Sequence, residues 1–91
     1  MDKNAINNSI KKIDNYVHEK DPLGLGGAPG EYSDVVFNLY RVAKEAMGKI
    51  TDDQIKNAFK NIFGELSDTL DVEDLNSVKD FIEKTVISEN D

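Results

Sequence analysis

Apolar residues recur at helical spacing in four segments of this chain. Those of the first segment are separated by four, three and four positions: Ile6, Ile10, Ile13 and Val17. This spacing stacks the side chains on one face of a helix, which we expect to run from about Lys3 to Glu19. Asn and Lys occupy most of the opposite face. The segment therefore predicts an amphipathic helix.

Three further apolar stripes predict three further helices. The second and broadest stripe comprises Val35, Val36, Leu39, Val42, Ala43, Ala46 and Met47, and it predicts the most buried helix, ending before Gly48. The third comprises Ile55, Ala58, Phe59, Ile62, Phe63 and Leu66, and it gives way near Ser67. The fourth comprises Leu75, Val78, Phe81, Ile82 and Val86. We expect the tail, residues 88–91, to fray.

Ser33, Thr51 and Asp71 are the predicted N-caps of the last three helices. Thr51 and Gln54 have the spacing of a capping box, in which each side chain accepts a hydrogen bond from the other residue's backbone amide. An apolar residue precedes each predicted cap, and another lies at the fourth helical position, as in a hydrophobic staple. The three pairs are Tyr32 with Phe37, Ile50 with Ile55 and Leu70 with Leu75.

Residues 21–30 form a predicted loop, because they contain both prolines and four of the six glycines of the chain. Leu23 and Leu25 are the apolar residues expected to anchor it. No segment alternates with the period of a strand, and no Asn-Gly or Asp-Gly hairpin turn occurs. The sequence therefore predicts an all-α fold, a compact four-helix bundle with a Pro/Gly-rich loop between its first two helices. We expect residues 1–91 to form a single helical domain.

Charge narrows the classes of partner. Eighteen Asp and Glu against eleven Lys and Arg give a net charge of -7, which disfavours nonspecific binding to nucleic acid or to an anionic membrane and favours a basic protein partner. The chain has no cysteine, so disulfides and thiolate zinc sites are excluded. No apolar run reaches the ~18 to 20 residues of a membrane span, and the polar start lacks the features of a signal peptide. We expect a cytoplasmic protein.

The negative charge is concentrated in the second half of the chain. Residues 1–47 contain six basic and seven acidic side chains, a balance of -1, whereas residues 48–91 contain five and eleven, a balance of -6. The acidic segment, residues 65–74, contains five acids and no Lys or Arg: Glu65, Asp68, Asp71, Glu73 and Asp74. One interpretation is helix capping and solubility. The other is an electrostatic docking surface for a basic protein.

The sequence gives little support to nucleotide binding, metal binding or catalysis. The loop glycines lack the preceding strand and the closing Lys of a nucleotide site, and His18 is the only histidine. Acids between Asp68 and Asp74 lack the glycine turn and terminal Glu of a calcium loop. The sequence Asp68-Thr69-Leu70 resembles the Asp-Ser-Leu site of acyl carrier proteins, but Thr69 replaces the serine and the site lies near the last helix. We therefore expect no cofactor, no metal and no catalytic residue.

One resemblance covers roughly residues 10 to 66. Asp21-Pro22-Leu23-Gly24-Leu25, followed by Glu31-Tyr32-Ser33 and an apolar helix, resembles the YugE-like family of small bacterial helical proteins of unknown function. The hallmark of that family is a Trp-Asp-Pro-apolar-Gly turn and then an acidic-Tyr pair. Lys20 stands where the family has Trp, and Ser33 stands where it often has Asp. The resemblance implies a helical fold and no enzyme activity.

The leading functional interpretation is a non-enzymatic acidic binding protein. In size and charge the chain resembles immunity proteins, acidic helical proteins that neutralise nuclease toxins, so we expect a tight 1:1 complex with a basic toxin or nuclease domain. The alternatives are a housekeeping regulatory protein of the YugE-like family and, in another class, a degenerate acyl-carrier-like protein or a small enzyme. The predicted partner-binding residues are Glu65, Asp68, Asp71, Glu73, Asp74, Glu31, Tyr32 and Asp34.

Overall fold

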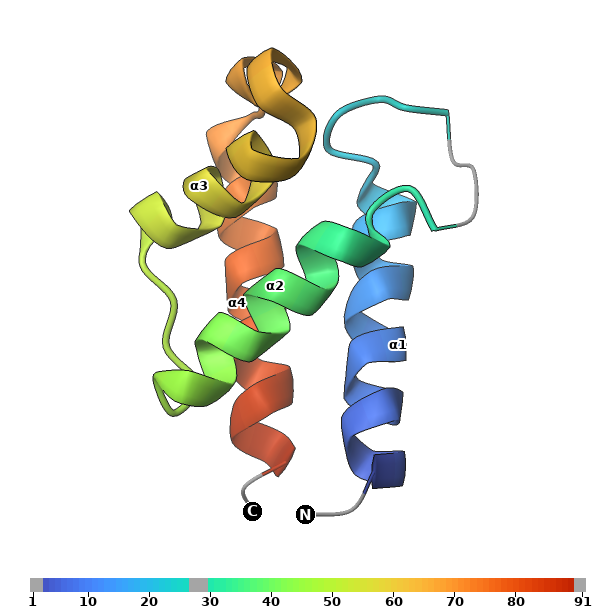
Figure 1. Cartoon of the computed structure of the whole chain (residues 1–91), viewed down its shortest axis with the longest axis vertical. Coiled ribbons are helices and arrows are strands. Elements are labelled where there is room, and N and C mark those ends of the chain that lie inside the picture. Colours follow the sequence, from blue (N-terminus) through green and yellow to red (C-terminus); the bar gives the residue numbers. More distant parts are fainter. Residues whose placement is uncertain (1–2, 27–29, 90–91) are drawn as a thin grey trace.

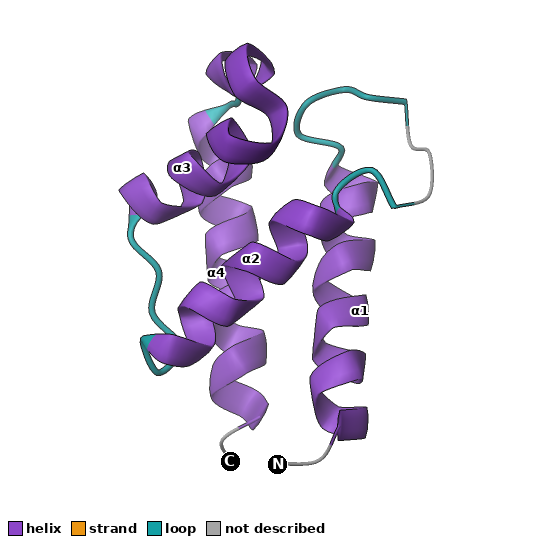
Figure 2. Ribbon diagram, viewed as in Figure 1, coloured by secondary structure: helices purple, strands orange, loops and turns teal. Residues whose placement is uncertain are grey.

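The computed structural model of the protein describes residues 3–26 and 30–89. Its elements are α1 (Lys3–Lys20), α2 (Ser33–Glu45), α3 (Asp52–Phe63), the short 3₁₀ helix η1 (Gly64–Thr69) and α4 (Val72–Glu89). No strand occurs in the described ranges (Figure 2). The predicted all-α, four-helix fold is confirmed. Residues 27–29 of the predicted loop lie outside the described residues.

The central helices of the bundle are α2 and α4, because each of them contacts the three other α-helices. Helices α1 and α3 lie on the two flanks and make no close approach to each other within the described ranges. Figure 1 shows α2 crossing in front of α4, while α1 runs alongside on one flank. The radius of gyration, 12.3 Å, is that of a compact chain of this length.

The core draws apolar side chains from all four α-helices. The largest share comes from α2, as predicted: Val35, Val36, Leu39, Tyr40 and Ala43 are buried. In α1 the second half of the apolar stripe is buried more deeply, since Ile13 and Val17 are fully covered whereas Ile6 and Ile10 are partly exposed. The flank between α1 and α4 is closed by a ring pair. Tyr16 stacks on Phe81 with ring centroids 4.2 Å apart.

Two of the three predicted N-caps are confirmed. Thr51 Oγ1 accepts from the Gln54 amide at 3.1 Å, and Gln54 Oε1 accepts from the Thr51 amide at 2.9 Å, which completes the capping box of α3. Asp71 Oδ1 accepts from the Glu73 amide at 3.1 Å and caps α4. Because these bonds join residues two or three positions apart, local sequence was sufficient to predict them.

The predicted start of α2 is wrong in two respects. Ser33 does not cap the helix; its hydroxyl donates to Asp14 Oδ2 of α1 at 3.2 Å, and no side chain caps the first turn. The Tyr32–Phe37 staple does not form either, because Phe37 is 56% exposed while Tyr32 is buried. Tertiary contacts between Ser33 and α1, and between Tyr32 and the loop, take the place of the local motif.

Helix ends also differ from the prediction. Helix α2 ends at Glu45, and Met47 lies outside the core with φ of 58°. Gly48 follows with φ of 96°, and a Cβ there would lie 2.7 Å from Ile87 Cγ1, so the chain passes close to α4. The predicted fraying at residue 88 is wrong, since α4 continues to Glu89. Asn90 and Asp91 lie outside the described residues.

Candidate protein-binding surface

The acidic segment connects α3 to α4 at one end of the bundle (Figure 1). Gly64 ends α3 with φ of 60°, a left-handed conformation that glycine adopts at little cost. The chain then turns through η1, in which the hydroxyls of Ser67 and Thr69 donate to the carbonyls of Gly64 and Leu66 at 2.7 and 2.8 Å. The fold of η1 therefore rests on backbone and hydroxyl groups and leaves its carboxylates available.

The predicted acids of this segment lie on the surface. Glu65, Asp68, Asp71 and Glu73 are exposed, and Asp74 is half-buried. Only the Asp71 carboxylate accepts a hydrogen bond, from the Glu73 amide. Within the described ranges the other four carboxylates form no hydrogen bond or ion pair. Their negative charge is thus directed to solvent or to a partner.

A groove of about 400 Å³ borders the acidic segment on the side of α3. Asp68, Leu70 and Val72 line it together with Lys56 and Lys60 of α3. No ion pair joins either lysine to Asp68 in the described part of the chain. Sequence reasoning missed these two lysines because it counted charge along the chain. Their spacing of four positions, which places both on one helix face, is the signal that could have found them.

Two apolar side chains stand among the exposed acids. Leu66 is 51% exposed and Val72 is 62% exposed. We predicted Leu66 as a core residue of the third helix, and that prediction is wrong. Because α3 ends at Phe63, the change to 3₁₀ geometry turns Leu66 away from the core stripe. The acidic segment therefore combines negative charge, which can steer a basic partner, with exposed apolar area.

Tyr32, a predicted partner-binding residue, is buried. Its hydroxyl donates to Asp21 Oδ1 at 2.6 Å and accepts from the Leu23 amide at 3.1 Å. Its ring lies 5.7 Å from that of Phe63 at the end of α3. The expectation that a partner contacts Tyr32 is corrected: with no exposed area, this side chain holds the loop and α3 together.

Asp21 and Tyr32 together anchor the loop between α1 and α2. Besides the Tyr32 hydroxyl, its carboxylate accepts from the amides of Leu25 at 2.9 Å and Gly26 at 3.3 Å. The bond from Tyr32, followed by that from Leu25, lowers the pKa of Asp21. Burial, followed by the bond to Asp21, raises the pKa of Tyr32 to about 12. Leu23 and Leu25 pack against the core, which confirms their predicted role.

The two remaining predicted residues differ in accessibility. Asp34 is exposed on the first turn of α2. Glu31 is half-buried, and its Oε2 is covered without a hydrogen-bond partner in the described ranges. Glu31 lies just before α2, and Asp34 belongs to its first turn. No contact joins α2 to η1 in the described ranges, so these two acids are not part of the acidic segment.

Among the residues it describes, the structure adds none to the carrier-protein site or to the metal sites that were considered from the sequence. Thr69, which stands where a carrier protein would have serine, lies in η1 and donates its hydroxyl to the Leu66 carbonyl. No group of three or more metal-ligating side chains occurs among the described residues. None of the described helices combines the length and the apolar composition that crossing a bilayer requires.

Comparisons with protein-family models, with curated proteins and with solved structures give no match to this chain. The resemblance to the YugE-like family therefore stays a prediction. Any functional conclusion has to rest on the surface that the residues themselves build.

Proposed function

We propose that this protein is a non-enzymatic binding protein whose acidic segment binds a basic protein partner. The observation that supports the proposal is the group of four carboxylates that neither a lysine nor a backbone amide of the described chain engages: Glu65, Asp68, Glu73 and Asp74. Unpaired carboxylates gathered at one end accelerate encounter with a basic surface and orient it.

The partner we propose is a toxin or nuclease domain, neutralised in a tight 1:1 complex as an immunity protein neutralises its toxin. A domain that binds nucleic acid carries a basic surface for phosphates. Carboxylates spread over the acidic segment supply the complementary charge. Leu66 and Val72, exposed among them, supply the apolar contact that a long-lived complex needs at its centre.

The test is an association-rate measurement with the toxin or nuclease domain encoded beside the gene of this protein. Asp68→Lys should slow association steeply, because Asp68 is exposed and has no structural bond. Raising salt should slow the wild type in the same way, since exposed charges are screened over ~8 Å at physiological ionic strength. Asp71→Lys is a poorer probe because Asp71 also caps α4.

Glu45→Lys is the matched control. Glu45 is exposed at the end of α2 that lies away from the acidic segment (Figure 1). Each substitution exchanges one negative for one positive charge, so each changes the net charge from -7 to -5. Equal slowing by both variants would show that only total charge matters. Unchanged association of Asp68→Lys at low salt would remove the acidic segment from the interface.

A further inference from the structure

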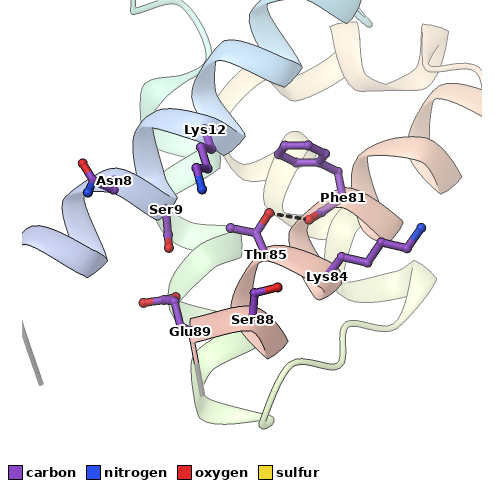
Figure 3. A pocket seen from close by; sticks show the side chains of 8 residues that line it. All are labelled: Asn8, Ser9, Lys12, Phe81, Lys84, Thr85, Ser88 and Glu89. Carbon is purple, nitrogen blue, oxygen red and sulfur yellow. Dashed lines mark hydrogen bonds between the residues drawn. The ribbon is translucent and has the colours of Figure 1, made fainter. Parts of the chain in front are cut away.

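A second candidate site lies at the opposite end of the bundle from the acidic segment. There a groove of about 490 Å³ separates the first half of α1 from the last turns of α4 (Figure 3). Sites for small molecules have volumes of roughly 300 to 1,000 Å³. The lining is rich in polar groups, although the same two helices pack tightly further along through Tyr16 and Phe81.

Ser9 supplies the first sign of a ligand. The residue is 6% exposed, and its side chain points from α1 into the groove (Figure 3). Its hydroxyl has no hydrogen-bond partner within residues 3–26 and 30–89, and its Oγ stays open to the groove, because the one enclosed side-chain oxygen without a partner in those ranges is Glu31 Oε2. Hydroxyls of residues this well covered usually have a hydrogen-bond partner, either in the protein or in ordered water. Water or a bound ligand in the groove can therefore serve as the partner of Ser9.

Lysines supply the charge of the site. Lys12, three positions after Ser9, points from α1 toward α4, and Lys84 borders the groove from α4 while extending outward (Figure 3). No ion pair engages either lysine in the described part of the chain. Lys12 thus directs one unpaired ammonium group into the part of the groove that Ser9 lines, and Lys84 adds a second positive charge at its rim.

Glu89 is the one acid that lines this groove, and its charge is already compensated. Both of its carboxylate oxygens accept from the Tyr40 hydroxyl, at 2.7 and 2.8 Å. The Lys44 ammonium lies 3.8 Å from Oε1, and only 6% of the Glu89 side chain is exposed. The carboxylate therefore belongs to the contact between α2 and α4, and the balance of the groove is positive.

We propose that the groove binds a small molecule through an oxyanion, a carboxylate or a phosphate group. Its oxygens accept hydrogen bonds from Ser9 Oγ and Lys12 Nζ, and the Lys84 ammonium at the rim adds longer-range attraction. Phe81, at the edge of the groove, offers an apolar surface to the rest of the molecule. This site is independent of the proposed binding of a basic protein, because it shares no residue with the acidic segment.

The experiment is a titration of the ¹⁵N-labelled full chain, followed by amide chemical shifts at constant ionic strength. The probes are sodium phosphate, phenyl phosphate and sodium acetate. We expect saturable shifts at the amides of Ser9, Lys12 and Ser88, with phenyl phosphate or phosphate if the ligand is a phosphate, and with acetate if it is a carboxylate. Lys12→Gln should weaken binding about tenfold, through loss of one charge-assisted hydrogen bond.

Lys11→Gln is the matched control, because Lys11 is exposed, adjacent in sequence and outside the groove lining. It should leave the affinity unchanged, and Ser9→Ala should weaken binding as Lys12→Gln does. The proposal is overturned if no probe gives saturable shifts, if the shifts fall outside the groove, or if both lysine variants lose affinity equally.

Discussion

Two connections meet at the same end of this bundle and use their polar groups in opposite ways. The connection from α1 to α2 directs its groups inward: Tyr32 and Pro22 are buried, and the Asp21 carboxylate accepts three hydrogen bonds from within the loop. The connection from α3 to α4 is held by η1 and by one cap, and it leaves four carboxylates without a partner in the described chain. Because its polar groups bond to one another, the connection from α1 to α2 has a structural role. The four unpartnered carboxylates of the connection from α3 to α4 make that connection the candidate interface.

The comparison separates the two candidate surfaces suggested by the sequence. Around Tyr32 an acid and an aromatic residue occur together, and aromatic residues are enriched in protein interfaces. Burial removes the aromatic ring from any partner. Among residues 65–74, the exposed apolar side chains Leu66 and Val72 take the place that Tyr32 was expected to fill.

The largest expected effect comes from removing the inward anchor. Tyr32→Ala should lower the free energy of unfolding by ~3 to 5 kcal/mol, as for other large buried aromatics, because it leaves a cavity beside Phe63 and removes one of the three hydrogen bonds to Asp21. Urea denaturation measures this loss. Phe37→Ala is the control, since Phe37 is 56% exposed and should cost far less. Equal losses for the two variants would contradict the assignment of Tyr32 to the core.

A smaller loss of stability is expected when only the hydrogen bond between Tyr32 and Asp21 is removed. Tyr32→Phe keeps the ring and should cost ~1.5 to 3 kcal/mol near neutral pH, the range for a bond to a charged acceptor. The pKa of Tyr32 is raised from 10.0 to about 12, so its contribution to stability is complete below pH 10 and is lost as pH rises through about 12. The pKa of Asp21 is lowered, so its contribution is complete above its ordinary value of 3.8 and is lost as pH falls through the lowered pKa.

The stability difference between wild type and Tyr32→Phe should therefore shrink at both extremes of pH. Urea denaturation at a series of pH values measures it. Burial and the bond to Glu89 also raise the pKa of Tyr40, so the wild type alone cannot separate the two tyrosines at high pH. The difference between the two proteins removes the contribution of Tyr40. A difference that stays constant across pH would contradict the Asp21–Tyr32 bond.

Predictions from the sequence succeeded where the interactions join residues close together in the chain, and failed where they join distant residues. Helices, the Thr51 capping box and the Asp71 cap depend on residues a few positions apart, and all were found. The exposure of Leu66 and Phe37 depends on where a helix ends and on what lies across the bundle, and neither was found. Tyr32 is engaged by Asp21, eleven positions away, and Glu89 by Tyr40, 49 positions away.

The residues of the candidate surface show the same difference between contacts that are local in sequence and contacts that depend on the fold. The group of five acids is visible in the sequence because it falls within one short segment, from Glu65 to Asp74. The lysines that face it, Lys56 and Lys60, belong to the preceding helix and come close only when η1 reverses the chain. The charge pattern of the chain thus locates the acidic segment, while the groove beside it can be recognised only in the tertiary fold.

Within the acidic segment, one residue should behave as a structural group. Asp71→Ala removes the cap of α4 and should cost ~0.5 to 2 kcal/mol in urea denaturation. Glu73→Ala is the matched control from the same turn, because its exposed side chain makes no bond in the described chain. We expect it to change stability by less than Asp71→Ala does. The reverse order would show that the cap does not operate in solution.

The smallest expected change in stability tests whether Leu66 of the acidic segment is exposed to solvent. Leu66→Ser should change the free energy of unfolding by no more than ~0.5 kcal/mol, because a side chain that is 51% exposed leaves little cavity when it is shortened. Leu39→Ala, in the buried stripe of α2, should cost ~2 to 5 kcal/mol and calibrates the urea measurement. A large loss for Leu66→Ser would restore this residue to the core, where its helical spacing from Ile62 and Phe63 first placed it. A negligible loss would leave Leu66 on the surface, where its apolar side chain is accessible to a partner and contributes little to folding.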